Sequence, residues 1–330
     1  MTPDNNNIVC SVKDLTVHYD VYPAPIVAVN KINFEVYTGE TLGLVGESGC
    51  GKTTTAMAML RLLQTPGRVV GGSVVVDGTD VMKLGASTLR AFRWRGIALI
   101  PQGAMNAMNP IMAVEKQIGD AITAHNNPGG RKALRTRISE LLVMVGLPEN
   151  VRKLYPHELS GGMKQRVCIA MAVALNPPLV IADEPTSALD VVVQRLVAES
   201  LIHIKQTLGN SMILIGHDMG LMAQLTDRVA VMYAGHIMEI APTPVLFKTP
   251  LHPYTQQLIE SVPSIKVKKA LRVFPGGPPD LRHLPPGCPF APRCPKAMPL
   301  CTKEMPLLQH YGERHQAACH AITAERSATT

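Results

Sequence analysis

Two groups of residues have types and spacings that could bind a nucleotide and its magnesium ion. The first spans residues 46–53, Gly-Glu-Ser-Gly-Cys-Gly-Lys-Thr, and fits the phosphate-binding pattern G-x-x-x-x-G-K-[ST]. Its glycines permit backbone shapes in which successive N–H groups point at phosphate oxygens. Lys52 should reach the β- and γ-phosphates, and the Thr53 hydroxyl should bind Mg²⁺. The residues expected to contact nucleotide are Gly46, Glu47, Ser48, Gly49, Cys50, Gly51, Lys52, Thr53 and Thr54.

The second group is a pair of carboxylates at the end of an apolar run. Residues 179–182, Leu-Val-Ile-Ala, suit a strand that is buried on both faces of a parallel sheet, and Asp183 and Glu184 follow directly. Asp183 can hold Mg²⁺ through the water shell of the ion, and Glu184 can act as general base toward an attacking water. An isolated Asp-Glu pair is more often an ordinary solvated strand end, so the interpretation depends on the context of the pair.

Both groups need short strands and helices to position them. Residues 41–45 form an apolar run that leads into the glycine loop, and residues 54–60 read as the helix after it, with its positive N-terminal end toward the phosphates. Residues 211–216 predict a further strand, which places His217 at its carboxyl end, where open α/β sheets bind ligands. The pattern predicts an α/β core.

A third motif separates one class of ATPases from the others. Residues 159–165, Leu-Ser-Gly-Gly-Met-Lys-Gln, begin a helix shortly before the Asp-Glu strand. Ser160 is a good N-cap, and the glycines let a nucleotide approach the helix end. With the three motifs in this order, the chain resembles the ATP-binding subunits of ABC transporters. The resemblance covers nearly the whole chain and implies a P-loop, RecA-like ATPase core, an inserted helical subdomain and a small Cys/Pro-rich C-terminal extension.

The resemblance also implies roles for individual residues. Gln102 matches the Q-loop glutamine, which contacts Mg²⁺ or water, and His217 matches the switch histidine at the γ-phosphate, although Gly216 replaces the usual Thr or Ser before it. Tyr19 stands where the family places an aromatic ring on adenine, or it packs in the core. Residues 185–190 resemble the D-loop. Ser160, Gly161 and Gly162 are expected to contact the ATP of a partner subunit, and Gln165 and Asp190 are also expected to contact nucleotide.

The resemblance and the composition together divide the chain. Residues 1–102 and 159–241 are expected to form the core, residues 103–158 the helical subdomain, with helices near 111–125 and 131–145, and residues 242–330 the extension. Of the 27 prolines, 15 lie between Pro242 and Pro306, so long regular elements are not expected there. The tail sequence His-Pro-Tyr-Thr at 252–255 resembles the peptide/nickel branch of ABC importers.

Four of the seven cysteines lie in this extension, at Cys288, Cys294, Cys301 and Cys319. A cytosolic protein would use them for metal binding rather than for disulfides. Structural zinc usually shows C-x2–4-C pairs, and the gaps here are wider. Permease ATPases with the same Cys-x5-Cys-x6-Cys pattern carry a [4Fe–4S] cluster, so the resemblance implies that cluster, with zinc or no metal as alternatives.

Composition limits location and partners. No apolar run approaches the ~18 residues that would span a bilayer, and residues 1–5 show no signal-peptide pattern, so a peripheral protein on the cytoplasmic face of the membrane is expected. The net charge of +7 raises the question of nucleic-acid binding. The basic residues of 131–137 alternate with apolar ones at helical spacing, which predicts the solvated face of an amphipathic helix. No nucleic-acid partner is expected.

The resemblance predicts the ATP-hydrolysing subunit of an importer for dipeptides, oligopeptides or related solutes such as oligosaccharides or nickel. The expected partners are a second ATPase subunit, for which the resemblance favours a sister chain, two transmembrane permease subunits and an extracellular or periplasmic solute-binding protein. The alternative is a soluble ABC ATPase of DNA repair or translation. Such chains typically carry a long coiled-coil insertion or two tandem ATPase units, and neither is evident in this sequence.

Overall fold

The computed structural model describes residues 7–103, 107–125, 128–187, 189–261, 276–277 and 279–322. Residues 1–5, where a signal peptide was sought, and Ala188 of the D-loop segment lie outside the described residues. The chain forms two compact units. The first comprises residues 1–11, 35–41 and 75–215, and the second comprises residues 12–34, 42–74 and 216–330.

A three-stranded parallel sheet organises the first unit, in the order β6 (Ile97–Ile100), β7 (Leu179–Asp183) and β8 (Ser211–Gly216). Ile97 pairs with Leu179, and Leu179 pairs with Ser211. Every residue of β7 and β8 is buried, as expected for parallel strands with both faces covered. The apolar run at 179–182 was therefore correctly predicted to be a buried strand, and the run at 211–216 was correctly predicted to be a strand.

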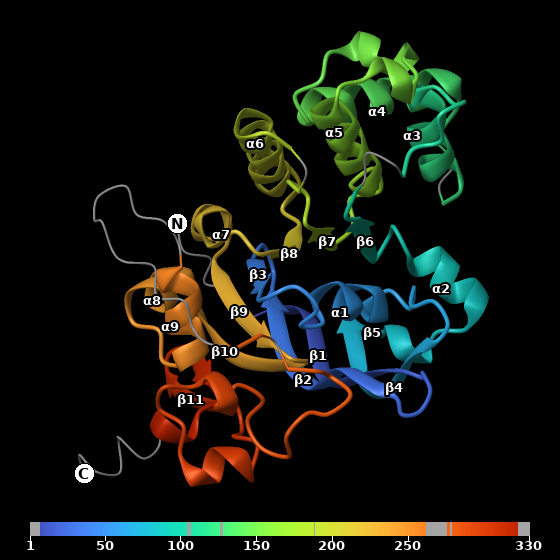
Figure 1. Ribbon diagram of the computed structural model, residues 1–330. Coiled ribbons are helices and arrows are strands. Elements are labelled where there is room, and N and C mark those ends of the chain that lie inside the picture. Colours follow the sequence, from blue (N-terminus) through green and yellow to red (C-terminus); the bar gives the residue numbers. More distant parts are fainter. Residues whose placement is uncertain are drawn as a thin grey trace. The chain divides into compact units, whose positions relative to one another are not determined.

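Helices fill most of the sequence between β6 and β7 (Figure 1). Those with the longest runs are α3 (Val114–Thr123), α4 (Arg131–Met144) and α5 (Gly161–Ala172), which pack on one another. Their contact faces carry buried aliphatic residues such as Ile118, Ile138 and Leu142. Both α3 and α4 lie within the ranges predicted to be helical, and the described residues from 107 to 158 contain no strand.

The other elements of the first unit are shorter or lie at its ends. They are β5 (Thr79–Asp80), η1 (Val81–Lys83), α2 (Ala86–Phe92), η3 (Glu149–Lys153), η4 (Pro156–Glu158) and α6 (Val191–Leu208). Helix α6 packs closely on α5, because a Cβ on Gly162 would lie 2.3 Å from the Cγ1 atom of Val193.

The second unit contains a sheet that begins at the strand before the phosphate-binding loop of residues 46–53, called the P-loop below. The sheet ends in the C-terminal extension. Strand β3 (Thr41–Val45) runs parallel to β9 (Arg228–Tyr233), which pairs antiparallel with β10 (His236–Pro242). Two strands of the extension continue this order, with β12 (His315–Ala317) on β10 and β11 (Gln309–Gly312) on β12. Glu239 pairs with Ala317 in this register. The proline-rich extension thus contains short strands that the sequence did not predict.

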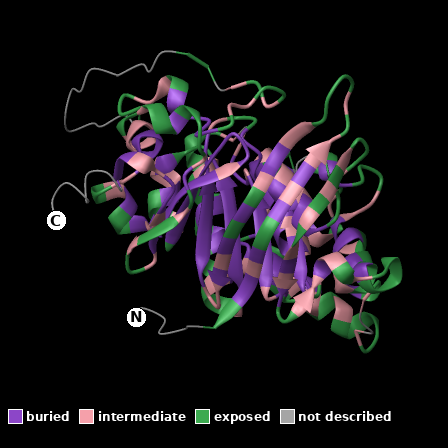
Figure 2. Cartoon of the chain, turned by 90° about the horizontal axis from the view of Figure 1, so that it is seen from below, coloured by how far each residue is buried: buried purple, intermediate pink, exposed green. Residues whose placement is uncertain are grey.

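The helices of this unit are α1 (Lys52–Met59), α7 (Met219–Leu225), α8 (Thr243–Lys248) and α9 (Pro253–Glu260), with short helical turns η5 (Ala291–Arg293) and η6 (Pro299–Thr302) in the extension. A separate sheet, most of which lies in this unit, has the strands β2 (Ile26–Tyr37), β1 (Ile8–Tyr19) and β4 (Gly67–Val76) side by side in this order. Buried and exposed residues alternate along its long strands (Figure 2), which is typical of a sheet with one covered face. None of the described helices is long and apolar enough to span a membrane.

Candidate nucleotide site

The P-loop follows β3 and ends at the first turn of α1, as the motif requires. Two of its glycines are enforced by neighbouring backbone. Gly46 has φ 153°, and a Cβ there would lie 2.1 Å from the carbonyl oxygen of Met232. Gly51 has φ 109°, and a Cβ there would lie 2.5 Å from the carbonyl oxygen of Ala28. Strands β9 and β2 therefore press against the loop and exclude any side chain at these two positions.

Lys52 lies inside this loop. Its side chain is buried, with 6% of the residue exposed, and Nζ donates hydrogen bonds to the carbonyl oxygens of Gly46 at 2.8 Å and Glu47 at 3.0 Å. Thr53 is exposed at the start of α1, and Ser48 and Gly49 are also exposed. A cationic ammonium, an accessible hydroxyl and a helix N-terminus thus come together, which is the donor set that a Mg²⁺-bound triphosphate requires.

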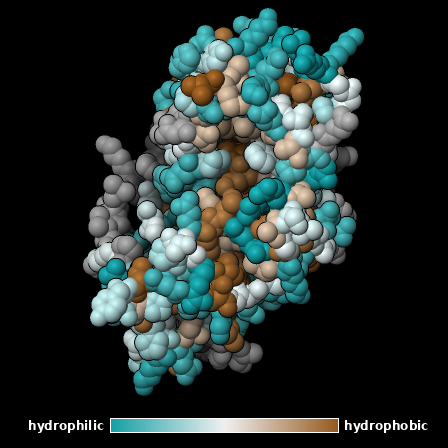
Figure 3. All heavy atoms as spheres, turned by 90° about the vertical axis from the view of Figure 1, so that its right-hand side faces the viewer, coloured by the Kyte–Doolittle hydropathy of each residue, from teal (hydrophilic) through white to brown (hydrophobic). Residues whose placement is uncertain are grey.

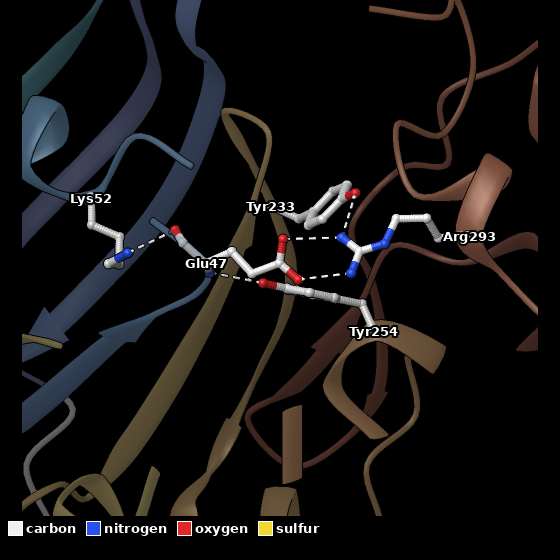
Figure 4. A network of polar contacts seen from close by, with 5 residues as sticks. All are labelled: Glu47, Lys52, Tyr233, Tyr254 and Arg293. Atoms are coloured by element: carbon white, nitrogen blue, oxygen red, sulfur yellow. Dashed lines mark hydrogen bonds and ion pairs between the residues drawn. The ribbon is translucent and has the colours of Figure 1, made fainter. Parts of the chain in front are cut away.

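Arg293 and Tyr254, whose contacts with the P-loop were not predicted from the sequence, hold Glu47 in place (Figure 4). The two terminal nitrogens of Arg293 each lie 3.0 Å from one carboxylate oxygen of Glu47. Arg293 also donates to the hydroxyl of Tyr233 at 3.1 Å, and the backbone N–H of Glu47 donates to the hydroxyl of Tyr254 at 2.9 Å. The sequence signal for this network is the acidic residue itself. A carboxylate in a phosphate-binding loop would repel the phosphates unless a positive charge lies beside it.

The first unit brings Glu184 and Gln102 together. Asp183 ends β7 fully buried, and Glu184 follows with φ 45°, a left-handed backbone that turns the chain sharply at the end of the strand. The backbone N–H of Glu184 donates to the carbonyl of Ile215 on β8 at 3.0 Å. The Glu184 carboxylate accepts a hydrogen bond from Nε2 of Gln102 at 3.0 Å. An acceptor for a water proton and an amide that orients it are therefore adjacent.

His217 and Tyr19 belong to the second unit. His217 is exposed directly after β8, and Asp218 beside it caps α7 through the N–H groups of Gly220 and Leu221. Tyr19 is half-buried at the end of β1, and its ring lies against Gly67, where an added Cβ would be 2.8 Å from Cε1. The roles of His217 at the γ-phosphate and of Tyr19 at adenine remain predictions.

The residues predicted to serve a partner's nucleotide form helix starts in the first unit. Ser160 caps α5, and its hydroxyl accepts from the N–H of Met163 at 3.3 Å. Gly161 is half-buried, Gly162 is buried against α6, and Gln165 is buried. Asp190 caps α6 by accepting from the N–H groups of Val192 and Val193, both at 3.0 Å. Ser160 and Asp190 are exposed, so each cap can be reached from outside the chain.

The four tail cysteines converge in the second unit. Cys288 and Cys301 are buried, and Cys294 and Cys319 are partly buried. The N–H of Cys288 donates to the carbonyl of Cys301 at 2.8 Å. The pKa of the Cys288 thiol is raised to about 12, mainly by burial and in addition by the nearby thiols of Cys301, Cys294 and Cys319. Within the described ranges, no group of three or more His, Cys, Asp or Glu side chains is arranged to hold a metal ion.

The chain is similar to known proteins over nearly its whole length. A family model described as ABC transporter matches residues 29–187, and one for the oligopeptide/dipeptide transporter C-terminal region matches residues 238–301. The dipeptide transport ATP-binding protein DppD of Bacillus subtilis is 41% identical over 94% of each chain. The oligopeptide transport ATP-binding protein OppD of Salmonella typhimurium is 42% identical over 92% of this chain and 91% of its own.

Among solved structures, the dimeric ATP-binding cassette MJ0796, in a post-hydrolysis state with ADP and Pi, is similar with a TM-score of 0.64 and 26% identity. The match covers 71% of this chain and 98% of that one.

Proposed function

The chain belongs to the ABC transporter ATP-binding proteins of the dipeptide and oligopeptide permease family, and we propose that it drives the import of dipeptides or oligopeptides through partner membrane subunits. It is a transport ATPase, for which ATP and Mg²⁺ are expected. The observation that carries the proposal is the Glu184–Gln102 pair at the end of β7, together with the preformed P-loop. Bound Mg²⁺ would neutralise charge on the phosphates, and the family resemblance assigns Thr53, Gln102 and Asp183 to it.

The residues of the chain divide the reaction between them. Lys52 binds and orients the phosphates, and Gln102 orients Glu184, which accepts a proton from the attacking water. His217 would contact the γ-phosphate. The exposed caps formed by Ser160 and Asp190 would contact the nucleotide that a second ATPase subunit holds, so that hydrolysis requires two subunits.

Several surface features support assembly with partners. Ile111 and Val143 of the first unit are 82% and 64% exposed, and Val191 and Val192 at the start of α6 are 81% and 72% exposed. The face shown in Figure 3 likewise carries hydrophobic atoms among hydrophilic ones. We assign the first pair to permease docking by the helical subdomain and the second pair to contact with a sister ATPase. A solute-binding protein completes the proposed importer, with this subunit peripheral on the cytoplasmic face.

The match at residues 238–301 favours this function over a soluble ATPase of DNA repair or translation, because the matching family model describes the C-terminal region of oligopeptide/dipeptide transporters. The solute itself, whether a dipeptide, an oligopeptide or a related oligosaccharide or nickel complex, is selected by the binding protein and the permease. A ligand screen on the binding protein would identify it.

The test is Glu184→Gln in the transporter reconstituted in vesicles. The amide oxygen can still accept from Gln102, but it cannot take a proton from water. ATP hydrolysis and solute uptake should fall by about 10²-fold or more, while ATP binding is retained. Glu199→Gln is the matched control, because Glu199 pairs with Arg195 on the exposed side of α6. Normal turnover in the Glu184→Gln transporter would remove Glu184 from the role of base.

We also propose that the four tail thiols hold a [4Fe–4S] cluster. The support is their convergence from distant positions and their number, which matches the four ligands of such a cluster. The cluster would supply cohesion to a segment with little core of its own.

Protein purified without oxygen should then be brown and contain about four irons and four sulfides per chain. Cys301→Ser should bleach it and weaken transporter assembly, whereas Cys168→Ser, in a buried cysteine of α5, should leave the colour unchanged. Stoichiometric zinc in colourless anaerobic protein would overturn the assignment to iron. Metal-free protein that assembles normally would overturn the structural role.

A further inference from the structure

Arg293 of the C-terminal extension reaches the ATP site through Glu47, the second residue of the P-loop (Figure 4). Its side chain is 9% exposed, and that of Glu47 is 26% exposed. Both terminal nitrogens of the guanidinium meet both oxygens of the carboxylate at 3.0 Å. Such bidentate, charge-assisted pairs fix orientation as well as distance. The contact joins residues that are 246 positions apart in the chain.

Aromatic rings surround this pair and leave it little freedom. The guanidinium carbon of Arg293 lies 5.8 Å from the ring centres of both Tyr233 and Phe290. Tyr254 lies against both of these rings, with centroid separations of 4.6 Å and 5.3 Å. The hydroxyl of Tyr254 accepts the backbone N–H of Glu47 at 2.9 Å. Glu47 is therefore held at its backbone by α9 and at its side chain by η5.

The electrostatic consequence concerns the nucleotide. Glu47 places a carboxylate in a loop that must receive a triphosphate, and two like charges in one site repel. Arg293 compensates this charge and draws the carboxylate toward the extension. It also restricts the rotation of the Glu47 side chain, so that less conformational entropy is lost when ATP binds.

We propose that Arg293 is a positioning residue of the ATP site, which neutralises Glu47 and holds the P-loop in the form that receives phosphate. The inference deepens the proposed function, because it rests on the binding of ATP at residues 46–53. It makes the extension part of the ATP site rather than a separate module.

The test measures the dissociation constant for MgATP and the KM and kcat of hydrolysis in the assembled transporter. Arg293→Ala should weaken ATP binding and raise KM by roughly tenfold, with a smaller effect on kcat, because the lost interaction orders the loop before chemistry. Arg293→Lys, which keeps the charge but not the fork, should fall between Arg293→Ala and the wild type. The matched control is Arg282→Ala, an exposed arginine of the same extension whose loss should leave ATP binding unchanged.

A second substitution separates positioning from general stability. In the Arg293→Ala background the Glu47 carboxylate is uncompensated, so adding Glu47→Gln should recover most of the lost affinity. If Arg293 only stabilised the fold, the double variant would be at least as impaired as Arg293→Ala. Unchanged affinity in Arg293→Ala, or no recovery in the double variant, would overturn the proposal. If Arg293→Ala does not fold, unchanged affinity in Arg293→Lys has the same force. Failure of the wild-type protein to bind MgATP would instead overturn the proposed function.

Discussion

Glu239 is a buried carboxylate on β10 that joins the ATPase sheet to the extension, and its replacement by glutamine gives a sharp test of this connection. It is fully buried, at 0% exposure. One oxygen accepts from the N–H of Leu251 at 2.8 Å and lies 2.8 Å from Nε2 of His315 on β12. The other oxygen accepts from the N–H of His252 at 2.9 Å. Three partners from two segments therefore share one carboxylate.

The magnitude follows from which of these contacts the amide can keep. Glutamine has one oxygen, which can keep the contacts to Leu251 and His315, and one NH₂ group, which would then face the N–H of His252. A hydrogen bond to a charged group contributes about 1.5–3 kcal/mol, and a buried donor without an acceptor costs about 1–3 kcal/mol. The neutral amide recovers part of this loss, because it has no buried charge to desolvate. We expect Glu239→Gln to weaken the attachment of this segment by about 2 kcal/mol, roughly 30-fold.

Amide hydrogen exchange measures this locally. In Glu239→Gln, exchange at the backbone amides of Leu251 and His252 should be roughly 30-fold faster, because both amides lose their charged acceptor. Glu313→Gln is the control, since Glu313 is exposed in the same extension. Exchange rates at these two amides that match those of the control would refute the reasoning, as would acceleration spread evenly over the whole chain.

Three further predictions concern single residues of the site and of the extension. Ser160→Arg should leave ATP binding by an isolated chain intact and abolish cooperative hydrolysis in the complex, as measured by nucleotide-binding and ATPase assays. Equal loss of binding and hydrolysis would mean that Ser160 acts at the P-loop of its own chain or in the fold. Gly46→Ala should weaken ATP binding by at least tenfold, as measured by nucleotide titration, because its Cβ would lie 2.1 Å from a backbone oxygen. Burial lowers the pKa of His252 to about 4, so the neutral ring stabilises the fold above the ordinary pKa of about 6.5, and this stability is lost as the pH falls from there toward 4. His252→Asn keeps an acceptor at the cap of α9. Between neutral pH and pH 4, its free energy of unfolding should therefore fall by about 3 kcal/mol less than that of the wild type, as measured by urea unfolding at several pH values. Parallel pH profiles of the two proteins would contradict this prediction.

The sequence predicted those parts of the structure that depend on neighbouring residues in the chain. The strands at 41–45, 179–182 and 211–216 were predictable because each is a continuous apolar run that ends at a motif, and β3, β7 and β8 lie at these positions. The loop glycines were predictable from their pattern. In these segments the local preference and the tertiary environment favour the same structure.

Long-range contacts left no comparable signal. Glu47 was predicted only as a residue near nucleotide, since nothing in its neighbourhood indicates a partner such as Arg293 in the extension. Strands β11 and β12 were missed because they have four and three residues and lie in a proline-rich segment, where propensity argues against strands and pairing with β10 overrides it. The left-handed backbone of Glu184 was also not predictable, since glutamate has no preference for that conformation.

The pairing of β12 with β10 has a consequence for any attempt to produce the ATPase core alone. The shift in composition near residue 242 suggests a convenient place to end a shortened protein, but a chain ending there would lack β12 and expose the row of N–H and C=O groups along β10 that it covers. An exposed edge strand rich in aliphatic residues, such as Ile237, Met238 and Ile240, is a template for pairing with other chains. Such a shortened protein should aggregate through this edge, so the extension also protects the molecule against self-association.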